Sequence, residues 1–291
     1  MKIIIRNCNV AELDIPLKYA TKLYNEFAIR HPNAFYLRTR QRGMQNWDGK
    51  IKYITKTGQF KIGLLPSVYK RCIELGIKPI IVDMRQPLPK VSKVVTQIGK
   101  YKLRPEQEKA VKAILSNKLG ETPFQIGVLD YTVNAGKTLI MSALYLSYKK
   151  QLKTLLITND SDWLNQARDE FKQYLPGEDI TFVQGKVLNW SNFTIGMVQS
   201  ISRNMKYYQN ELAKIDMVLI DEADQGGSKQ YQNVITRLFN TRVRIGLSGT
   251  IYMSKLAKDK VKNMNLRCFF GDVIAEFKLK DSIKKGHSTK T

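Results

Sequence analysis

The stretch Asp130-Tyr131-Thr132-Val133-Asn134-Ala135-Gly136-Lys137-Thr138 decides which fold the sequence predicts. It follows an apolar run, Gln125–Asp130, that is typical of a buried strand, and it precedes a segment with the apolar spacing of a helix. A loop that opens a helix points backbone N–H groups at anions. Gly136 would allow a phosphate to approach closely, Lys137 would reach the β and γ phosphates of a nucleotide, and the Thr138 hydroxyl would coordinate magnesium. We expect this nucleotide cradle to consist of Asn134, Ala135, Gly136, Lys137 and Thr138.

This stretch departs from the full phosphate-loop pattern at one position. GxxxxGK[ST] has glycine where Tyr131 stands. The three residues Gly-Lys-Thr also occur in ordinary turns, so a chance turn is the alternative interpretation. The predicted strand before the loop and the predicted helix after it favour the phosphate loop.

A second stretch with chemical meaning is Met217-Val218-Leu219-Ile220-Asp221-Glu222-Ala223-Asp224. An apolar strand that ends in an acidic pair is typical of the Walker B arrangement. There Asp221 would hold Mg²⁺, usually through water, and Glu222 would orient and polarise the attacking water. The alternative is an acidic helix cap. The pair lies 84 residues after Lys137 (221 − 137), and the two motifs together predict a site that hydrolyses ATP with Mg²⁺.

Strands and helices alternate along the chain after residue 100. Apolar runs such as Met217–Ile220 suit parallel strands that are buried on both faces. This alternation predicts a doubly wound α/β domain that binds ligands at the carboxyl ends of its strands. The predicted strands are Gln125–Asp130, Thr154–Thr158, Ile180–Val183, Thr194–Val198, Met217–Asp221 and Arg244–Ser248, and the predicted helices are Pro105–Leu115, Lys137–Tyr148, Asp162–Tyr174 and Lys229–Leu238.

The first part of the chain predicts a separate, small α+β domain. The stretch 86–100 contains Pro87 and Pro89, which disfavour a helix, and we interpret it as a linker. We therefore expect an N-terminal domain over residues 1–90 and a nucleotide-binding domain over 91–280. In the first domain we predict helices at Pro16–Ile29 and Pro66–Leu75, strands at Ala34–Thr39, Lys50–Thr55, Gln59–Gly63 and Pro79–Asp83, and a tight turn at Thr57-Gly58.

The charge balance indicates a polyanionic partner. Lys and Arg number 48 against 25 Asp and Glu, a net charge of +23, and residues 1–95 carry +12 of it (18 basic minus 6 acidic residues). Basic residues gain affinity by displacing counterions from phosphates, although a basic surface without a partner is the alternative. In the predicted strand, Arg38, Arg40 and Arg42 would share one face, with Lys50 and Lys52 following. We interpret these five side chains as a nucleic-acid contact, or else as a solvated face.

Trp47 lies between the two basic groups, and we favour a place for it in the small core. Three widely spaced cysteines, Cys8, Cys72 and Cys268, predict neither a disulfide framework nor a zinc site and fit a reducing cytosol. The chain has no apolar run of about 18 residues, so we expect no membrane span.

Together these motifs resemble superfamily 2 helicases. The resemblance is carried by the Gly-Lys-Thr and Asp-Glu-Ala-Asp stretches, by Ser248-Gly249-Thr250, and by Leu103-Arg104-Pro105-Glu106-Gln107. It implies a RecA-like lobe in which Gln107 reads the adenine edge and the Ser-Gly-Thr stretch couples nucleotide state to nucleic-acid binding. It also implies that Leu155–Gln166 and Thr194–Ser200 contact the nucleic-acid backbone, with Thr158, Gln199 and Ser200 as candidates. A polar loop or cap is the alternative role for these three.

The resemblance narrows to the UvsW family of phage DNA helicases, which remodel branched DNA. Asn46-Trp47-Asp48-Gly49-Lys50 and Phe270-Gly271-Asp272 are similar to stretches of that family, whereas the Ser-Gly-Thr stretch differs from the Ser-Ala-Thr of DEAD-box RNA helicases. This implies an ATP-dependent DNA helicase acting in recombination and repair, expected as a monomer in the cytoplasm. Other double-strand DNA translocases, such as restriction-enzyme motors, and a DNA-binding module with a vestigial nucleotide site are the alternatives.

A motor of this superfamily needs a second RecA-like lobe with arginine fingers. Residues 281–291 resemble a linker toward such a lobe, and we interpret the lysines Lys278, Lys280, Lys284 and Lys285 as a solvated segment. We therefore expect a fragment with little ATPase activity of its own, because loss of an arginine finger costs on the order of 10³–10⁵ in rate.

Overall fold

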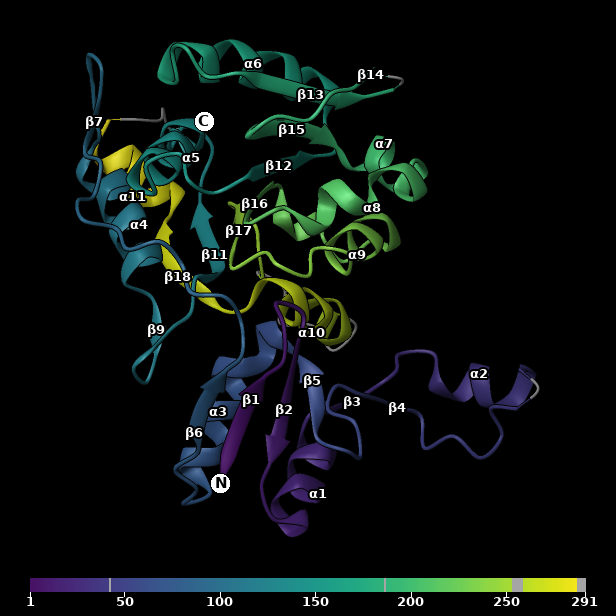
Figure 1. Cartoon of the computed structure of the whole chain (residues 1–291). Helices are drawn as coiled ribbons and strands as arrows, with labels where there is room; N and C mark the ends of the chain where they lie inside the picture. The colour runs from purple at the N-terminus through teal and green to yellow at the C-terminus, as the bar shows by residue number, and fades with distance from the viewer. Residues whose placement is uncertain (42, 186, 253–258, 287–291) are drawn as a thin grey trace. The chain divides into compact units, whose positions relative to one another are not determined.

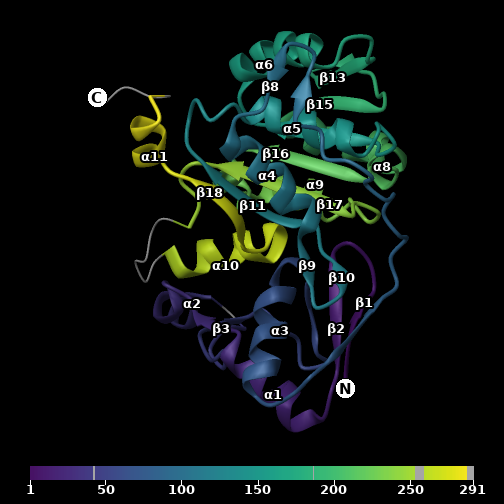
Figure 2. The same cartoon turned by 90° about the vertical axis from the view of Figure 1, so that its left-hand side faces the viewer.

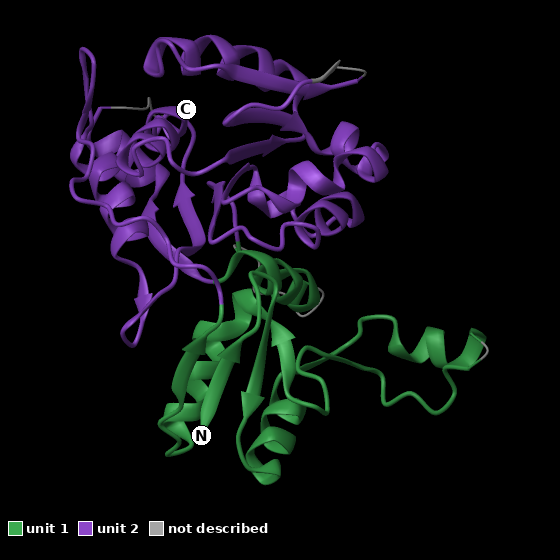
Figure 3. Cartoon of the chain, viewed as in Figure 1, with its two compact units in different colours: residues 1–84, 252–271 green, residues 85–251, 272–291 purple. Residues whose placement is uncertain are grey.

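The computed structural model describes residues 1–41, 43–185, 187–252 and 259–286. The chain forms two compact units, one of residues 1–84 and 252–271 and one of residues 85–251 and 272–291 (Figure 3). The first unit thus includes the described residues 252 and 259–271, which lie outside the predicted N-terminal domain of residues 1–90.

The second unit is built on an eight-stranded sheet with the order β14-β13-β15-β12-β16-β17-β11-β18. Seven of these strands run parallel, and only β14 is antiparallel to its neighbour. In chain order the strands are β11 (Ile126–Tyr131), β12 (Thr154–Thr158), β13 (Ile180–Gln184), β14 (Val187–Leu188), β15 (Phe193–Met197), β16 (Met217–Asp221), β17 (Val243–Ser248) and β18 (Val273–Phe277).

Helices cover both faces of this sheet, as the sequence predicts for apolar parallel strands. Every residue of β11, β12, β15, β16 and β17 is buried. Figure 1 shows α4 and α5 on one side of the sheet and α8 and α9 on the other. The helices of this unit are α4 (Pro105–Ser116), α5 (Lys137–Ser147), α6 (Ser161–Tyr174), α7 (Val198–Arg203), α8 (Met205–Ala213), α9 (Lys229–Ile235) and α11 (Leu279–Lys284), with the short 3-10 helix η2 (Ala223–Gln225).

Two short hairpins complete this unit: β7 (Gln97–Ile98) with β8 (Tyr101–Lys102), and β9 (Lys118–Leu119) with β10 (Thr122–Pro123), which lie side by side in Figure 2. The predicted doubly wound α/β fold is confirmed, and its predicted strands and helices are present within a few residues of their expected ends. The prediction missed β18, α7, α8 and α11. The described residues of the predicted linker 281–291 begin inside helix α11, where Ser282 is fully buried.

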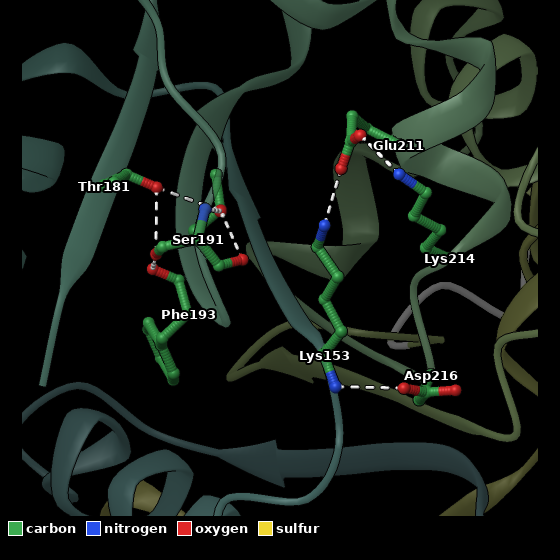
Figure 4. Close-up of polar contacts among 8 residues, drawn as sticks. Lys153, Thr181, Ser191, Phe193, Glu211, Lys214 and Asp216 are labelled. Carbon is green, nitrogen blue, oxygen red and sulfur yellow. Dashed lines mark hydrogen bonds and ion pairs between the residues drawn. The ribbon is translucent and has the colours of Figure 1, made fainter.

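Polar contacts join the amino end of β12 to α8 and to the residue before β16 (Figure 4). The backbone N–H of Lys153 donates to Oδ2 of Asp216 at 3.0 Å, and its Nζ donates to Glu211 at 2.5 Å. Lys214 donates to the other carboxylate oxygen of Glu211 at 2.8 Å. These contacts lie at the amino ends of the strands, opposite to the carboxyl ends from which the motif loops extend.

The first unit is a small α+β fold. Its sheet has the order β5-β2-β1-β6, with β1 antiparallel to β2 and parallel to β6. The strands are β1 (Lys2–Ile5), β2 (Val10–Asp14), β5 (Gln59–Lys61) and β6 (Ile80–Asp83), and the helices are α1 (Leu17–Glu26), η1 (Ile62–Leu64), α3 (Leu65–Glu74) and α10 (Asp259–Phe270). The turn at Thr57-Gly58 is confirmed, since Gly58 adopts a φ of +83° and donates to Thr55 O.

Glycine at position 63 allows helix α10 to pack closely on η1. A Cβ atom at Gly63 would lie 2.1 Å from the carbonyl oxygen of Arg267 and 2.8 Å from that of Cys268. Tyr53 adds a hydrogen bond of 3.0 Å from its hydroxyl to Oδ1 of Asn265. The packing of α10 on η1 therefore requires glycine at position 63.

The predicted strand Ala34–Thr39 is wrong, because residues 34–40 form helix α2 (Ala34–Arg40). The helix follows β3 (Ala28–Arg30), which pairs with β4 (Lys50–Lys52) in a separate two-stranded ribbon. Ala34 is buried against Gly49, whereas Arg38 and Arg40 are exposed. Two residues of a helix that lie two positions apart do not share a face, so the predicted alternation of arginines along a strand does not exist. Arg42 lies outside the described residues.

All three cysteines are buried, and none of them forms a disulfide. Within the described part of the chain, no helix has the length and apolar character needed to cross a membrane.

Candidate nucleotide site

The loops that carry the predicted motifs lie together at the carboxyl ends of the strands of the large sheet. The strands β11, β17, β16, β12 and β15 are neighbours in that order, and they are parallel. Their carboxyl ends therefore lie side by side, and the loops after them form a continuous row. This order brings together motifs that are far apart in the sequence, since Ser248 follows Lys137 by 111 positions (248 − 137).

The phosphate loop runs from the end of β11 to the start of α5. Gly136 has a φ of +71° directly before the first helical residue, and Asn134 has a φ of +61°. This left-handed geometry suits glycine and is tolerated by asparagine, and it turns successive N–H groups toward one point. Nζ of Lys137 lies 3.8 Å from Oδ1 of Asp221, so the positive charge of the loop faces the acidic end of β16. Thr138 is largely buried in the first turn of α5.

Tyr131 belongs to the strand, which accounts for the departure from GxxxxGK[ST]. It is the last residue of β11 and is fully buried, and its hydroxyl donates to the carbonyl oxygen of Glu106 at 2.8 Å. The hydroxyl thus ties the strand end to helix α4. The loop itself therefore consists of Thr132 to Gly136, between the end of β11 and the start of α5.

Gln107 holds the phosphate loop in this structure. Its Nε2 donates to the carbonyl oxygen of Ala135 at 2.9 Å, and its Oε1 accepts the N–H of Arg104 at 2.8 Å. The side chain is buried, and a Cβ atom added to Gly136 would lie 2.3 Å from Nε2. Reading of adenine by Gln107 stays a prediction, since its amide already contacts the loop.

Arg104 and Glu106, in the same stretch as Gln107, also support the loop, although the motifs predict no role for them. Arg104 donates to the carbonyl oxygen of Asn134 at 3.1 Å and pairs with Glu106 at 3.1 Å. Lys285, in the segment that we predicted to be solvated, pairs with the other oxygen of Glu106 at 2.8 Å. Lys278 likewise pairs with the buried Asp130. Arg104 and Glu106 could have been identified by their positions next to Gln107 in the sequence. No feature of the sequence indicated the pairing of Lys285.

The acidic end of β16 fits a magnesium ion bound together with nucleotide phosphates. Oδ1 of Asp221 is buried and accepts no hydrogen bond among the described residues. Burial raises the pKa of Asp221, Lys137 opposes this rise, and Asp160 and Asp224 add to it. A carboxylate oxygen that is buried without a donor is suited to a cation. No group of three or more Asp, Glu, His or Cys residues in the described ranges could hold a metal alone, so phosphates and water would supply further ligands.

Glu222 follows Asp221 in a strained conformation. Its φ and ψ are both 51°, a left-handed geometry that is uncommon outside glycine and asparagine. Much of its side chain is exposed, but the carboxylate is partly desolvated, and this desolvation together with the charges of Asp221, Asp224 and Asp160 raises its pKa. Such a carboxylate can accept a proton from water more readily than an ordinary glutamate. Asp160, which also caps helix α6, is an acidic neighbour that the motifs did not identify.

Ser248 connects the end of β17 to the acidic loop. Its hydroxyl donates to Oδ1 of Asp224 at 2.8 Å and accepts the N–H of Thr250 at 3.2 Å. Gly249 lies against the start of the phosphate loop, where an added Cβ atom would be 3.2 Å from Cα of Thr132. The Ser-Gly-Thr stretch therefore touches both halves of the site, a position suited to coupling.

The three candidates for nucleic-acid backbone contact lie on the neighbouring strand ends. Thr158 is fully buried, and its hydroxyl accepts the N–H of Asp160 at 3.1 Å, so a direct phosphate contact would require it to become exposed. Gln199 donates to the carbonyl oxygen of Asn159 at 3.3 Å, and Ser200 accepts the N–H of Gly185 at 2.9 Å. Both are partly exposed. Nucleic-acid contact by all three stays a prediction.

The basic candidates of the first unit lie on the segment from β3 to β4. Lys50 is exposed, whereas Lys52 pairs with Asp48 at 3.2 Å and lies over the ring of Tyr24. Trp47 is half-buried, and its Nε1 donates to the carbonyl oxygen of Lys50 at 3.0 Å. The structure thus gives Trp47 and Lys52 local packing roles, and Arg38, Arg40 and Lys50 free access to solvent.

The parallel sheet and the row of loops define this unit as a RecA-like nucleotide-binding lobe of the superfamily 2 helicases. The family model described as "Type III restriction enzyme, res subunit" matches residues 100–253, more than half of the chain. The chain belongs to this family.

Relatives among known proteins agree with this assignment. The ATP-dependent DNA helicase uvsW of Enterobacteria phage T4 is 24% identical over 227 residues, which cover 71% of this chain and 43% of that protein. The putative ATP-dependent RNA helicase L396 of Acanthamoeba polyphaga mimivirus is 26% identical over 147 residues, which cover 50% of this chain and 27% of that protein. The chain thus spans less than half the length of either relative.

A crystal structure of the UvsW helicase from bacteriophage T4 has the same fold. It superposes with a TM-score of 0.73 at 21% identity and covers 94% of this chain and 100% of the solved chain. A second UvsW structure gives a TM-score of 0.70 over 94% of this chain and 57% of that chain. The likeness includes the small N-terminal α+β unit, which the family model does not reach.

Proposed function

We propose that the chain supplies the ATP-binding lobe of an ATP-dependent DNA helicase or translocase that remodels branched DNA. The observation that carries this proposal is the meeting of the phosphate loop, Asp221 and Glu222, and Ser248 at neighbouring strand ends. Each of these groups alone occurs in many proteins. Their joint position on adjacent parallel strands supports a nucleotide site that is connected to a second function.

Different residues of the lobe would have different roles in ATP hydrolysis. Lys137 and the N–H groups at the start of α5 would bind the phosphates, and Thr138 and Asp221 would hold the magnesium. The ion would neutralise charge on the β and γ phosphates when it is bound. Glu222 would orient the attacking water and accept its proton, which its raised pKa favours.

A DNA partner is supported by charge and by relationship. The net charge of +23 favours a polyanion, and the relative that shares the larger part of this chain is named a DNA helicase. The proposal includes a second RecA-like lobe that would close over the nucleotide with arginine fingers, and a monomeric protein. Arg38, Arg40 and Lys50 would contact the DNA backbone, together with Gln199 and Ser200.

The experiment compares the wild type with Lys137→Ala in the natural protein that contains these residues. ATPase rates would be measured with single-stranded DNA, duplex DNA, branched DNA and RNA. We expect branched DNA to stimulate most, and we expect Lys137→Ala to lower the rate at least about 100-fold, as removal of one charge-stabilising donor does in other enzymes. Lys172→Ala is the matched control, because this exposed lysine lies in the last turn of α6.

The possible outcomes separate the competing functions. Stimulation by RNA that equals or exceeds stimulation by branched DNA would reject the fork-remodelling part. Stimulation by plain duplex alone would favour a translocase of the restriction-enzyme kind. If the wild-type chain binds DNA but no nucleotide, the vestigial-site alternative holds and the motor proposal is wrong.

A further inference from the structure

The segment between Ala28 and Tyr53, which we call the arm, presents two aromatic side chains to solvent. Phe35 is 81% exposed and Tyr36 is 54% exposed on helix α2. Figure 1 shows this helix extending away from the four-stranded sheet of its own unit. Consecutive aromatic residues at such exposure cost free energy unless a ligand covers them.

Contacts within the arm stabilise its conformation, and they fix the position of the helix that carries Phe35 and Tyr36. The N–H of His31 donates to the carbonyl oxygen of Gly49 at 2.8 Å, and the rings of His31 and Trp47 meet edge to face at 5.9 Å. Gly49, at a φ of +75°, lets Ala34 approach, because a Cβ atom there would lie 3.0 Å from Cβ of Ala34. The inner face of α2 is thus fixed, and Phe35 and Tyr36 are displayed on its outer face.

The charge of the arm identifies the class of ligand. Residues 28–53 contain six basic residues and one acidic residue, and that acidic residue, Asp48, is already paired with Lys52. The guanidinium of Arg40 lies 4.9 Å from the centre of the Tyr36 ring and covers one face of it. Exposed aromatic rings beside arginines are suited to a strand whose bases stack and whose phosphates are neutralised. An apolar protein partner would not call for this excess of cations.

We propose that Phe35 and Tyr36 form a stacking platform for unpaired bases of a nucleic-acid strand, with Arg38 and Arg40 gripping the adjoining phosphates. Phe35 is the main platform because nothing described in the structure covers either face of its ring to the extent that Arg40 covers Tyr36. This inference deepens the proposed function and rests on it. The arm would then bind where a nucleic-acid duplex opens into single strands, because only unpaired bases have a ring face free for stacking.

The test measures binding of the whole chain, without nucleotide, to a DNA fork that carries 2-aminopurine at its first unpaired position. We expect Phe35→Ala to weaken binding between about 5- and 150-fold and to abolish the change in 2-aminopurine fluorescence. The salt dependence of the affinity should stay the same, because no charge is removed. Phe35→Trp should restore binding, whereas Phe35→Leu, which keeps apolar area without an aromatic face, should not.

Leu17→Ala is the matched control, since Leu17 is 75% exposed on α1 of the same unit and lies outside the arm. It should leave fork affinity unchanged, as should Phe35→Ala on a fully paired duplex. A parallel series with an RNA fork distinguishes the two sources of unpaired bases. Thermal unfolding of each variant ensures that a loss of binding does not reflect loss of the fold.

Failure of this inference can be told from failure of the proposed function. If the wild-type chain binds no nucleic acid, both are wrong. If the wild type binds and Phe35→Ala binds equally well with the same fluorescence change, only the stacking platform is wrong. A wild-type dimer in sedimentation that Phe35→Ala converts to monomer would also overturn it, because the aromatics would then join two copies of the chain.

Discussion

The hydroxyl of Ser248 donates a hydrogen bond of 2.8 Å to the carboxylate of Asp224 and so joins the end of β17 to the acidic segment that follows β16. Ser248 is 2% exposed, and the same hydroxyl accepts the N–H of Thr250. A change in the acidic loop on nucleotide binding can therefore reach the Ser-Gly-Thr stretch through one contact.

Replacing Ser248 by alanine should separate nucleotide binding from its consequences. We expect a loss of about 1.5–3 kcal/mol in the free energy of unfolding, the usual worth of a hydrogen bond to a charged group. Nucleotide affinity should change much less than the DNA-stimulated ATPase rate. Urea unfolding and a DNA titration of the rate check this, with Ser248→Thr as the control that keeps the hydroxyl. Equal falls in the stimulated and unstimulated rates would contradict a coupling role.

The contact between Gly136 and Gln107 predicts an effect that is not additive. Gly136→Ala should destabilise by about 1–2 kcal/mol through its left-handed conformation, and by more because the new Cβ atom would displace Nε2 of Gln107. In a Gln107→Ala background the second cost disappears, so Gly136→Ala should cost less there. A double-mutant cycle on unfolding free energy and nucleotide affinity measures the difference. Strict additivity would show that the two residues act independently.

The ion pairs of Glu106 predict that replacing Glu106 and replacing Lys285 will change the free energy of unfolding by different amounts. The Glu106 side chain is 4% exposed, whereas that of Lys285 is 44% exposed. Glu106→Gln should destabilise by about 3–5 kcal/mol, because Arg104 would lose its partner beside the phosphate loop. Lys285→Ala should cost less, about 1 kcal/mol, because the lysine end of the pair is exposed and Glu106 keeps its pair with Arg104. Urea unfolding of both variants tests this, and a larger effect for Lys285→Ala would place the main support elsewhere.

Stability should fall in acid through Glu211. Hydrogen bonds from Lys153 and Lys214 lower the pKa of Glu211 below its ordinary value of 4.5 (Figure 4). The unfolded chain then binds the proton more tightly, so the stabilisation is complete above about pH 4.5 and is lost as the pH falls through the lower folded pKa. Asp216 acts in the opposite direction, because burial raises its pKa.

Glu211→Gln should therefore flatten the decline in unfolding free energy below about pH 4.5 and cost about 0.5–1 kcal/mol at pH 7. Urea unfolding at a series of pH values measures both. Asp216→Asn is the control, and it should steepen the decline. An unchanged slope in Glu211→Gln would assign the acid sensitivity to other carboxylates.

Local sequence determined the elements of the large sheet. Met217–Ile220 is apolar throughout and lies in a strand buried on both faces. Helix α5 (Lys137–Ser147) begins directly after Gly136, because the glycine can adopt the left-handed conformation of the turn. The α2 helix was predicted wrongly as a strand because alternating arginines and aromatic residues favour strands locally. Its burial of Ala34 against Gly49, fifteen positions away (49 − 34), decides for the helix.

The way in which the elements combine depends on contacts between segments that are distant in the sequence. The strand order β11-β17-β16-β12 places Lys137 within 3.8 Å of Asp221 and Ser248 within 2.8 Å of Asp224. It also turns Gln107 onto the phosphate loop and returns α10 to the N-terminal unit through the space that Gly63 leaves. The residues that could serve a nucleotide site are readable from the sequence, because motif chemistry and strand propensity are local. The contacts among those residues depend on strand order and close backbone approach, which arise only when distant segments pack.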